Sequence, residues 1–230
     1  MDVAIDNSAP AGPLVIDCAP PFLIVRLPAN CRALGWSLAR PGFAETSTVA
    51  WLEVRNADLT PDVDPLRLLR EKLAARGLDD AVAFMTSRDI RRHHVALRQA
   101  DGVTAACVAT VGLANGEAVG ARRKVEAFPG TINTLVHVSC PLTDAAFIEA
   151  ISIVAQARTA ALFDTAHLRP GPRITGTGTD CIVVAAPLGP DAESCAGLHT
   201  ATGEAIGGAV YDAVRDGAEV WSADMAQPDR

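Results

Sequence analysis

The chain has 230 residues, of which 49% are hydrophobic and 20% are charged, a composition typical of one large globular domain and unlike that of a disordered chain. Lys and Arg total 20 against 27 Asp and Glu, so the net charge is −7, and an acidic chain of this kind is a poor general binder of nucleic acid. The six cysteines are scattered without a Cys-x-x-Cys pair, so we expect neither a structural zinc site nor another metal centre.

The N-terminal residues 1–13 are predicted to form a flexible tail. They carry Asp2 and Asp6 and no basic cluster, so they lack the features of a secretory signal. The apolar run at 22–27 is interrupted by Arg26 and is far shorter than the ~20 residues that a membrane-spanning helix needs. We therefore expect a cytoplasmic protein that does not bind membranes.

The first half of the chain predicts mainly strands. Apolar runs of strand length occupy residues 14–18, 22–27, 31–37, 46–54 and 81–85. One helix is expected over 65–76, because Asp64 suits its N-cap and Gly77 suits the left-handed position after its end. The adjacent His93 and His94 would point to opposite faces of a strand, so we favour an ordinary exposed pair over a metal site.

The middle of the chain predicts two further strands, over 103–113 and 130–139. In the second strand one face is apolar, whereas the other carries Thr131, Asn133 and His137. This alternation is typical of a strand that borders a functional site. The compact basic run at 122–124 is interpreted as a solvated loop.

The longest helical pattern covers 144–163, with Thr143 as its expected N-cap. Arg158 falls on the same side as the apolar residues Phe147, Ile151, Val154 and Leu162. An unpaired guanidinium on such a face would be costly. Arg158 must therefore pair with a carboxylate such as Asp180 or reach a substrate, and the sequence does not choose between these partners.

The last part of the chain predicts a buried strand over 181–186 and a final helix. Thr202 is the expected cap of this helix, which should stop at Gly217 and be followed by an acidic tail over 218–230. Residues 14–217 are expected to form a single domain. Its fold class is α/β of the α+β type, with one mixed sheet or two packed sheets and the helices on the outside.

The sharpest local signal is Thr-Gly-Thr-Gly-Thr-Asp at 175–180, hereafter the Thr–Gly loop. Its hydroxyls and unobstructed backbone N–H groups could hold an anion or polarise a carbonyl. It is not a nucleotide-binding P-loop, because it lacks the Lys-Ser/Thr ending and leads into a strand. A purely structural tight turn, in which Asp180 caps its own loop, explains the sequence of this segment equally well.

Other reactive side chains are weaker candidates. Cys140 and Cys181 stand beside polar motifs and could be nucleophiles, although a buried structural role is favoured for both. His137 and His199 are the best placed histidines for a general base, yet either could be an ordinary structural residue.

Several motifs occur in the order and spacing of a known family. They occupy residues 84–86, 111–115, 130–134, 155–162, 175–180 and 196–207. Together they span about residue 30 to about residue 217 and resemble the adenosylcobinamide amidohydrolases. Members of that family hydrolyse the amide between the aminopropanol arm and a corrin propionate, which yields adenosylcobyric acid for coenzyme B12 salvage.

The resemblance implies a hydrolase of a non-peptide C–N bond whose substrate is a small corrinoid, with no separate cofactor. The family's usual Thr-Glu-Ala-Lys is Ala155–Arg158 here, so Gln156 replaces a carboxylate and Arg158 replaces a lysine. The stretch 35–42 also departs from the family's serine and glycine pattern. A corrinoid-binding protein without catalysis, or an amidase for another small amide, therefore remains an alternative.

The expected mechanism is attack of water on the amide carbonyl, with a side-chain hydroxyl as the less favoured nucleophile. Asp180 or a histidine would take the proton, and the Thr–Gly loop with Asn133 would stabilise the oxyanion. The candidate catalytic residues are Asp180, Thr179 and Asn133. The candidate substrate-binding residues are Ser37, Asn115, Thr131, Arg158, Thr175, Thr177 and Thr202. This hypothesis requires Asn133 and Asp180 to share one cavity, and it leaves open whether the chain forms a homo-oligomer.

Overall fold

The computed structural model describes residues 13–121, 130–168 and 171–226. Residues 1–12 of the tail predicted at 1–13, and the basic run at 122–124, lie outside these ranges. The described helices are α1 (Pro65–Ala74), α2 (Asp144–Asp164) and α3 (Ala201–Ala226). The strands are β1 (Val15–Ala19), β2 (Phe22–Gly35), β3 (Gly42–Glu53), β4 (Val82–Thr86), β5 (His93–Ala100), β6 (Val103–Val111), β7 (Gly116–Glu117), β8 (Ile132–Val138), β9 (Gly176–Thr177) and β10 (Cys181–Pro187). Short 3₁₀ turns lie at Asn56–Asp58, Ile90–Arg92 and Ala166–Leu168.

One mixed sheet contains most of the strands. Its order is β4-β3-β2-β10-β8-β6-β5, and β1 pairs with β2 beside this path. The pairs β3–β4 and β8–β10 are parallel, whereas the other pairs of this sheet are antiparallel. Strands β7 and β9 form a separate antiparallel pair above it.

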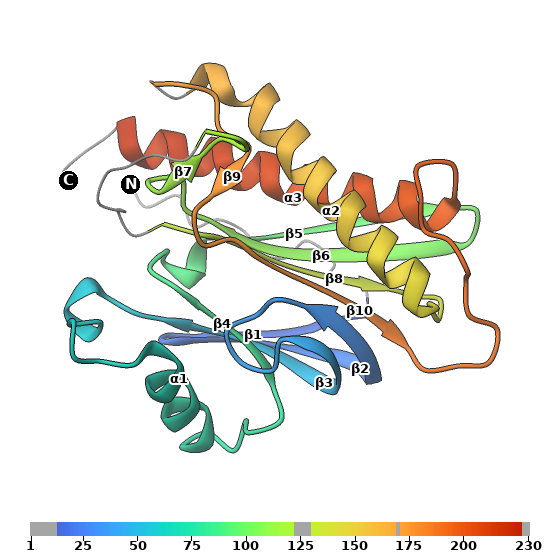
Figure 1. Ribbon diagram of the computed structural model, residues 1–230, viewed down its shortest axis with the longest axis horizontal. Helices are drawn as coiled ribbons and strands as arrows, with labels where there is room; N and C mark the ends of the chain where they lie inside the picture. Colours follow the sequence, from blue (N-terminus) through green and yellow to red (C-terminus); the bar gives the residue numbers. More distant parts are fainter. Residues whose placement is uncertain (1–12, 122–129, 169–170, 227–230) are drawn as a thin grey trace.

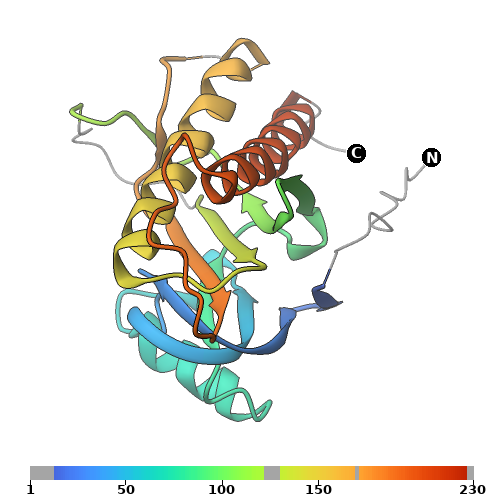
Figure 2. The same ribbon diagram turned by 90° about the vertical axis from the view of Figure 1, so that its right-hand side faces the viewer.

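The sheet folds over, so that its two halves pack against each other. The core between the halves joins Trp51 and Phe84 of β3 and β4 to Val108, Leu135 and Val183 of the opposite half. Helix α1 covers the outside of the first half, and α2 with α3 covers the outside of the second. Figures 1 and 2 show these four layers in the order helix, sheet, sheet, helix. The predicted α+β class with a mixed sheet and outer helices is confirmed.

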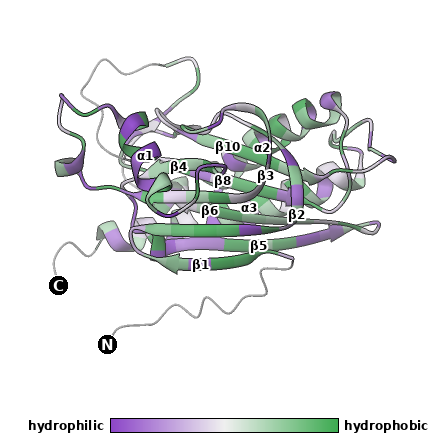
Figure 3. Cartoon of the chain, turned by 90° about the horizontal axis from the view of Figure 1, so that it is seen from below, coloured by the Kyte–Doolittle hydropathy of each residue, from purple (hydrophilic) through white to green (hydrophobic). Residues whose placement is uncertain are grey.

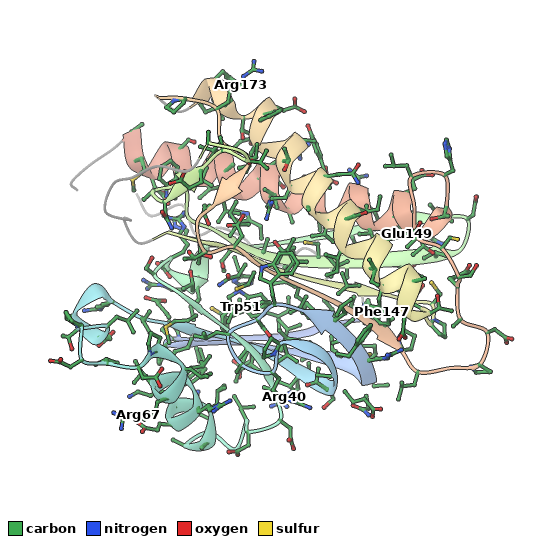
Figure 4. The ribbon with its side chains drawn as sticks, viewed as in Figure 1. Arg40, Trp51, Arg67, Phe147, Glu149 and Arg173 are labelled. Atoms are coloured by element: carbon green, nitrogen blue, oxygen red, sulfur yellow. The ribbon has the colours of Figure 1, made fainter. Side chains whose placement is uncertain are left out.

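Side-chain character follows these layers. Figure 3 shows hydrophobic residues over most of the strands and hydrophilic residues over much of α1. Trp51 lies among the strands, and Phe147 points from α2 toward the sheet (Figure 4). Both side chains are fully buried, so large apolar residues hold the layers together on both faces of the second half of the sheet.

Strand β2 differs from the prediction, which divided it into two strands at 22–27 and 31–37. It is one strand whose register with β3 shifts between Arg26 and Cys31, as expected of a bulge that bends a strand. The part before the shift pairs with β1, and the part after it pairs with β10. The bend therefore connects the two halves of the folded sheet.

The predicted starts of α1 and α2 are confirmed. The Asp64 carboxylate accepts a hydrogen bond from the N–H of Leu66, and the Thr143 hydroxyl accepts one from the N–H of Ala146. Gly77 has a φ of +65° just after α1, in the left-handed region that favours glycine. By length and composition α2 could cross a membrane, but its buried residues pack on the sheet, as in the core helices of globular folds.

Both predicted ends of α3 are wrong. Thr200 is the cap, because its hydroxyl accepts a hydrogen bond from the N–H of Gly203 at 2.9 Å, whereas Thr202 is buried inside the first turn. The helix continues through Gly217 to Ala226, so residues 218–226 are helical. A Cβ at Gly217 would lie 2.5 Å from Val111 Cγ2. This glycine therefore serves close packing on β6 and does not end the helix.

The expectation of an exposed histidine pair is also wrong. His93 is buried, with Nδ1 2.7 Å from the carbonyl oxygen of Ile90. His94 points to the opposite face of β5, where its ring packs against Gly217 of α3. Within the part of the chain that the structure describes, no three His, Cys, Asp or Glu side chains gather as a metal site.

Candidate active site

The Thr–Gly loop lies where β10 begins, beside the start of β8. Strand β9 within the loop pairs with β7, and β10 then runs parallel to β8 with Cys181 opposite Asn133. The loop and the polar residues at the start of β8 therefore meet at one end of two neighbouring strands. The structure brings together most of the residues that the sequence singled out.

The Asp180 carboxylate is the centre of the loop. Oδ1 accepts hydrogen bonds from the N–H of Ile132 at 3.1 Å and from the Thr177 hydroxyl. Oδ2 accepts the N–H of Thr177 at 3.0 Å and forms an ion pair with Arg158 Nη1 at 2.8 Å. The alternative in which Arg158 pairs with Asp180 is therefore the observed one, and the two side chains are 15% and 7% exposed.

Burial raises the pKa of the Asp180 carboxyl, and the Arg158 charge with the hydrogen bonds from Thr177 and Ile132 opposes that rise. Both oxygens are already occupied by donors, which leaves little capacity to take a proton from water. Gly176 is required beside the pair, because a Cβ there would lie 2.5 Å from Asp180 Oδ2. The geometry favours a carboxylate that holds the loop in shape.

Asn133 is fully buried and connects the two halves of the sheet. Its Nδ2 donates a hydrogen bond to the carbonyl oxygen of Met85 in β4 at 2.9 Å. The Thr131 hydroxyl lies 3.2 Å from Asn133 Oδ1 and 2.8 Å from the carbonyl oxygen of Thr179. The Asn133 amide is therefore engaged within the protein, as a structural tie between β8 and β4.

Two cavities lie on opposite sides of these strand ends. One, the loop cavity, has a volume of about 320 Å³ and is lined by Trp36, Arg158, Thr175, Thr177 and Asp180 among others. The other, the sheet-end cavity, has a volume of about 280 Å³ and lies at the end of the sheet, where its apolar residues belong to the cluster between the first half and α1. Its lining includes Leu59, Met85, Thr86, Thr131, Thr179 and Cys181.

The expected common cavity of Asn133 and Asp180 is not formed among the described residues. Since side chains alternate along a strand, Thr179 and Cys181 face the sheet-end cavity while Asp180 between them faces the loop cavity. Asn133 shares the face of Cys181 but lines neither cavity. The two residues lie at the same end of neighbouring strands, with their side chains on opposite faces.

Three other predicted residues belong to the same region. The carbonyl oxygen of Asn115 accepts a hydrogen bond from the N–H of Gly178 at 3.0 Å. The Thr175 hydroxyl accepts one from the N–H of Val119 at 2.8 Å. Thr177 binds Asp180, as described above. These contacts fix both edges of the Thr–Gly loop.

Ser37 and Thr202 lie outside this cluster. The buried Ser37 hydroxyl donates to the carbonyl oxygen of Ala39. Thr202 lies at the far end of β8, with Oγ1 3.7 Å from Cys140 Sγ. The sequence missed Trp36, whose Nε1 donates to the carbonyl oxygen of Asp180 at 2.7 Å. The available signal was that Trp36 lies in the stretch 35–42, which departs from the family's usual pattern.

The weaker candidates do not gain support from their positions. Burial raises the pKa of the Cys181 thiol to about 11, so it is protonated at neutral pH and a poor nucleophile. Burial also raises the pKa of Cys140. His137 is buried between the sheet halves with its pKa lowered to about 4. His199 is exposed in the loop before α3, away from the Thr–Gly loop.

A third hollow, of about 1100 Å³, is an open groove between α2 and α3. Gln156 and Gly207 line it, whereas Arg158 two residues away faces Asp180. Three charged residues of the groove form ion pairs with one another, since Asp212 pairs with Arg98 and with Arg215. The groove is larger than the loop cavity and the sheet-end cavity, but the convergent polar groups lie at the Thr–Gly loop, which we take as the candidate active site.

Comparison with known proteins gives a consistent result. The family model described as adenosylcobinamide amidohydrolase matches residues 10–226, which include the Thr–Gly loop and the start of β8. A protein of Halobacterium salinarum named adenosylcobinamide amidohydrolase is 32% identical over 172 residues, which cover 69% of this chain and 68% of that relative. The chain belongs to the adenosylcobinamide amidohydrolase family and is a hydrolase that acts on an amide C–N bond.

Proposed function

We propose that this protein cleaves the amide between the aminopropanol arm and the corrin propionate of adenosylcobinamide, and so yields adenosylcobyric acid for coenzyme B12 salvage. The observation that carries the proposal is the family match, which covers residues 10–226 and includes every residue of the polar strand end. In this proposal the protein is cytoplasmic and its substrate is the small-molecule corrinoid. The reaction needs no separate cofactor, and the protein binds neither nucleic acid nor membranes.

The chemistry at the strand end follows from the groups present. Water adds its oxygen to the amide carbon, the C–N bond breaks, and the amine leaves with a proton derived from that water. Thr131 and Thr179 line the sheet-end cavity. Their hydroxyls donate to the carbonyl oxygens of Thr179 and Gly130, and we assign their remaining lone pairs to accepting the N–H of the amide. The ionised Asp180, paired with Arg158, keeps the Thr–Gly loop in place from the other side.

The chain has Gln156 and Arg158 where the family usually has Glu and Lys. Neither replacement takes a functional group away from the site where the Thr–Gly loop meets the start of β8. Gln156 lines the groove between α2 and α3, so the missing carboxylate would not have faced the Thr–Gly loop. Arg158 keeps a positive charge against Asp180 at 2.8 Å. Both placements support catalysis over a corrinoid-binding protein that has lost it.

The test is incubation of the purified protein with adenosylcobinamide, with mass spectrometry of the corrinoid product and of released aminopropanol. Formation of adenosylcobyric acid supports the proposal. Tight binding without product would identify a corrinoid-binding protein, and neither binding nor product would indicate an amidase for another amide.

A pair of matched variants tests the assigned site. Thr131→Val should lower kcat/KM at least tenfold, because it removes a hydroxyl at the strand end. Thr134 is the control, since it is buried three residues along β8 with a hydroxyl that has no hydrogen-bond partner among the described residues. Thr134→Val should keep the activity of the parent protein. Equal activity of both variants would remove Thr131 from the site.

A further inference from the structure

The sheet-end cavity has a definite chemical character. It lies between the end of β4 and the starts of β8 and β10, beside the cluster that packs under α1. Its apolar lining comes from Leu38, Val54, Leu59 and Met85. Its polar lining includes Thr131 and Thr179, whose hydroxyls donate to backbone carbonyl oxygens and keep lone pairs that can accept further hydrogen bonds. Arg55 at its edge is exposed to solvent. The interior therefore suits a short neutral chain that carries both an alkyl group and a hydrogen-bonding group.

The volume limits what the cavity can hold. Pockets for whole drug-sized ligands have volumes of roughly 300–1,000 Å³, and this one has about 280 Å³. A corrin macrocycle is too large for it, whereas a chain of a few heavy atoms is not. The amide-linked aminopropanol arm is such a chain, with one methyl group, one hydroxyl and no charge while the amide is intact.

The loop cavity has the opposite character, because the charged side chains of Arg158 and Asp180 face it. A neutral chain with a methyl group would lose hydration there without gaining apolar contact. The side chains of Leu59 and Met85 offer that contact in the sheet-end cavity. Of the two cavities, the chemistry of the arm matches the sheet-end cavity.

We propose that the sheet-end cavity receives the aminopropanol arm and thereby selects corrinoid amides by the size of their amine. This inference rests on the proposed function. The methyl group packs against Leu59 and Met85, and the Thr131 and Thr179 hydroxyls bind the polar atoms of the arm. The macrocycle stays outside, and the scissile amide lies at the mouth of the cavity.

The test measures kcat/KM for adenosylcobinamide and for an analogue whose arm carries phenyl in place of methyl. Met85→Ala enlarges the cavity and should raise the relative kcat/KM for the bulky arm at least tenfold. Cys181→Leu narrows it and should raise the KM for adenosylcobinamide at least tenfold. Cys140→Leu changes another half-buried cysteine, at the far end of β8, and should keep the preference of the parent protein.

The outcomes separate the two proposals. If the parent protein hydrolyses adenosylcobinamide but Met85→Ala keeps its arm preference and Cys181→Leu keeps its KM, the cavity assignment is overturned and the proposed function stands. If the parent protein yields no product, the proposed function fails and the cavity loses its proposed occupant. Thermal melting followed by circular dichroism checks that each variant folds. If Cys181→Leu does not fold, the arm preference of Met85→Ala alone tests the cavity assignment.

Discussion

Arg158 and Asp180 form a buried ion pair, with Nη1 and Oδ2 2.8 Å apart, between the middle of α2 and the start of β10. The pair joins the outer helix layer to the Thr–Gly loop. Its partners are unequal, because Asp180 accepts three further hydrogen bonds, whereas Arg158 Nε has no hydrogen-bond partner among the described residues. Removing one partner therefore differs in effect from removing the other.

We predict that Asp180→Asn lowers the free energy of unfolding by about 3–5 kcal/mol, since it leaves a buried guanidinium without a counter-charge. Arg158→Met should cost less, because the carboxylate keeps its other three hydrogen bonds. Arg158→Lys should cost least, because it keeps the charge. Urea unfolding at neutral pH measures all three differences.

The exposed pair of Arg67 and Glu71 on α1 supplies the control for these variants. Arg67, which Figure 4 labels on α1, is 72% exposed, and its Nε lies 3.7 Å from Glu71 Oε1. Arg67→Met should therefore change stability by less than about 0.5 kcal/mol. A loss in Arg158→Met no larger than that in Arg67→Met would show that the buried pair does not stabilise the fold.

Gly176 tests how closely the loop is packed around that pair. A Cβ at this position would lie 2.5 Å from Asp180 Oδ2 and 3.2 Å from Arg158 Cζ. Gly176→Ala should therefore displace the ion pair and destabilise the protein by about 1–3 kcal/mol. In Gly178→Ala the nearest atom is Asn115 Nδ2 at 3.0 Å, the end of a side chain that can shift. Thermal melting should rank the Gly176 variant below the Gly178 variant, and the reverse order would contradict the packing.

The sequence predicted the parts of this fold that depend on neighbouring residues. Asp64 and Thr143 cap helices through bonds to residues two or three positions away, which a sequence pattern can reveal. Arg158 on an apolar helix face required a counter-charge, and Asp180 was one of the two partners considered. A helix cap depends only on residues two or three positions away, and the need for a counter-charge follows from the single charge of Arg158. Both can therefore be recognised in the sequence.

The sequence did not predict what depends on distant pairing. The bend in β2 and the folding over of the sheet follow from strand partners far along the chain. Gly217 looked like a helix end because its close contact with Val111 could not be known. The separation of Asn133 from Asp180 follows from the register of β8 and β10. Once Cys181 is opposite Asn133, Asp180 must point to the other face.

The start of α3 gives a third prediction. The Thr200 hydroxyl accepts the N–H of Gly203 at 2.9 Å, so Thr200→Ala should lower the free energy of unfolding by about 1 kcal/mol. Thr202→Val keeps the shape of its buried side chain and removes only a hydroxyl 3.7 Å from Cys140 Sγ, so it should cost less. Chemical unfolding compares the free energies of unfolding of the two variants. A larger decrease for Thr202→Val would indicate that Thr202, not Thr200, caps α3.

The last prediction concerns pH. His137 is buried between the sheet halves, its Nε2 has no hydrogen-bond partner among the described residues, and burial lowers its pKa to about 4. The unfolded chain binds a proton at this residue near its ordinary pKa of about 6.5. Between these two values the unfolded state therefore holds more protons than the folded state, and stability falls as the pH falls.

The size of this effect can be isolated with one variant. Between pH 6.5 and pH 4 the parent protein should lose about 3 kcal/mol more stability than His137→Phe, which has no proton to bind at that position. His94, whose pKa is also lowered to about 4 by burial, is present in both proteins, so its contribution cancels. Urea unfolding at several pH values measures the difference. Parallel pH dependence in the two proteins would mean that His137 is charged, or solvated, in the folded state.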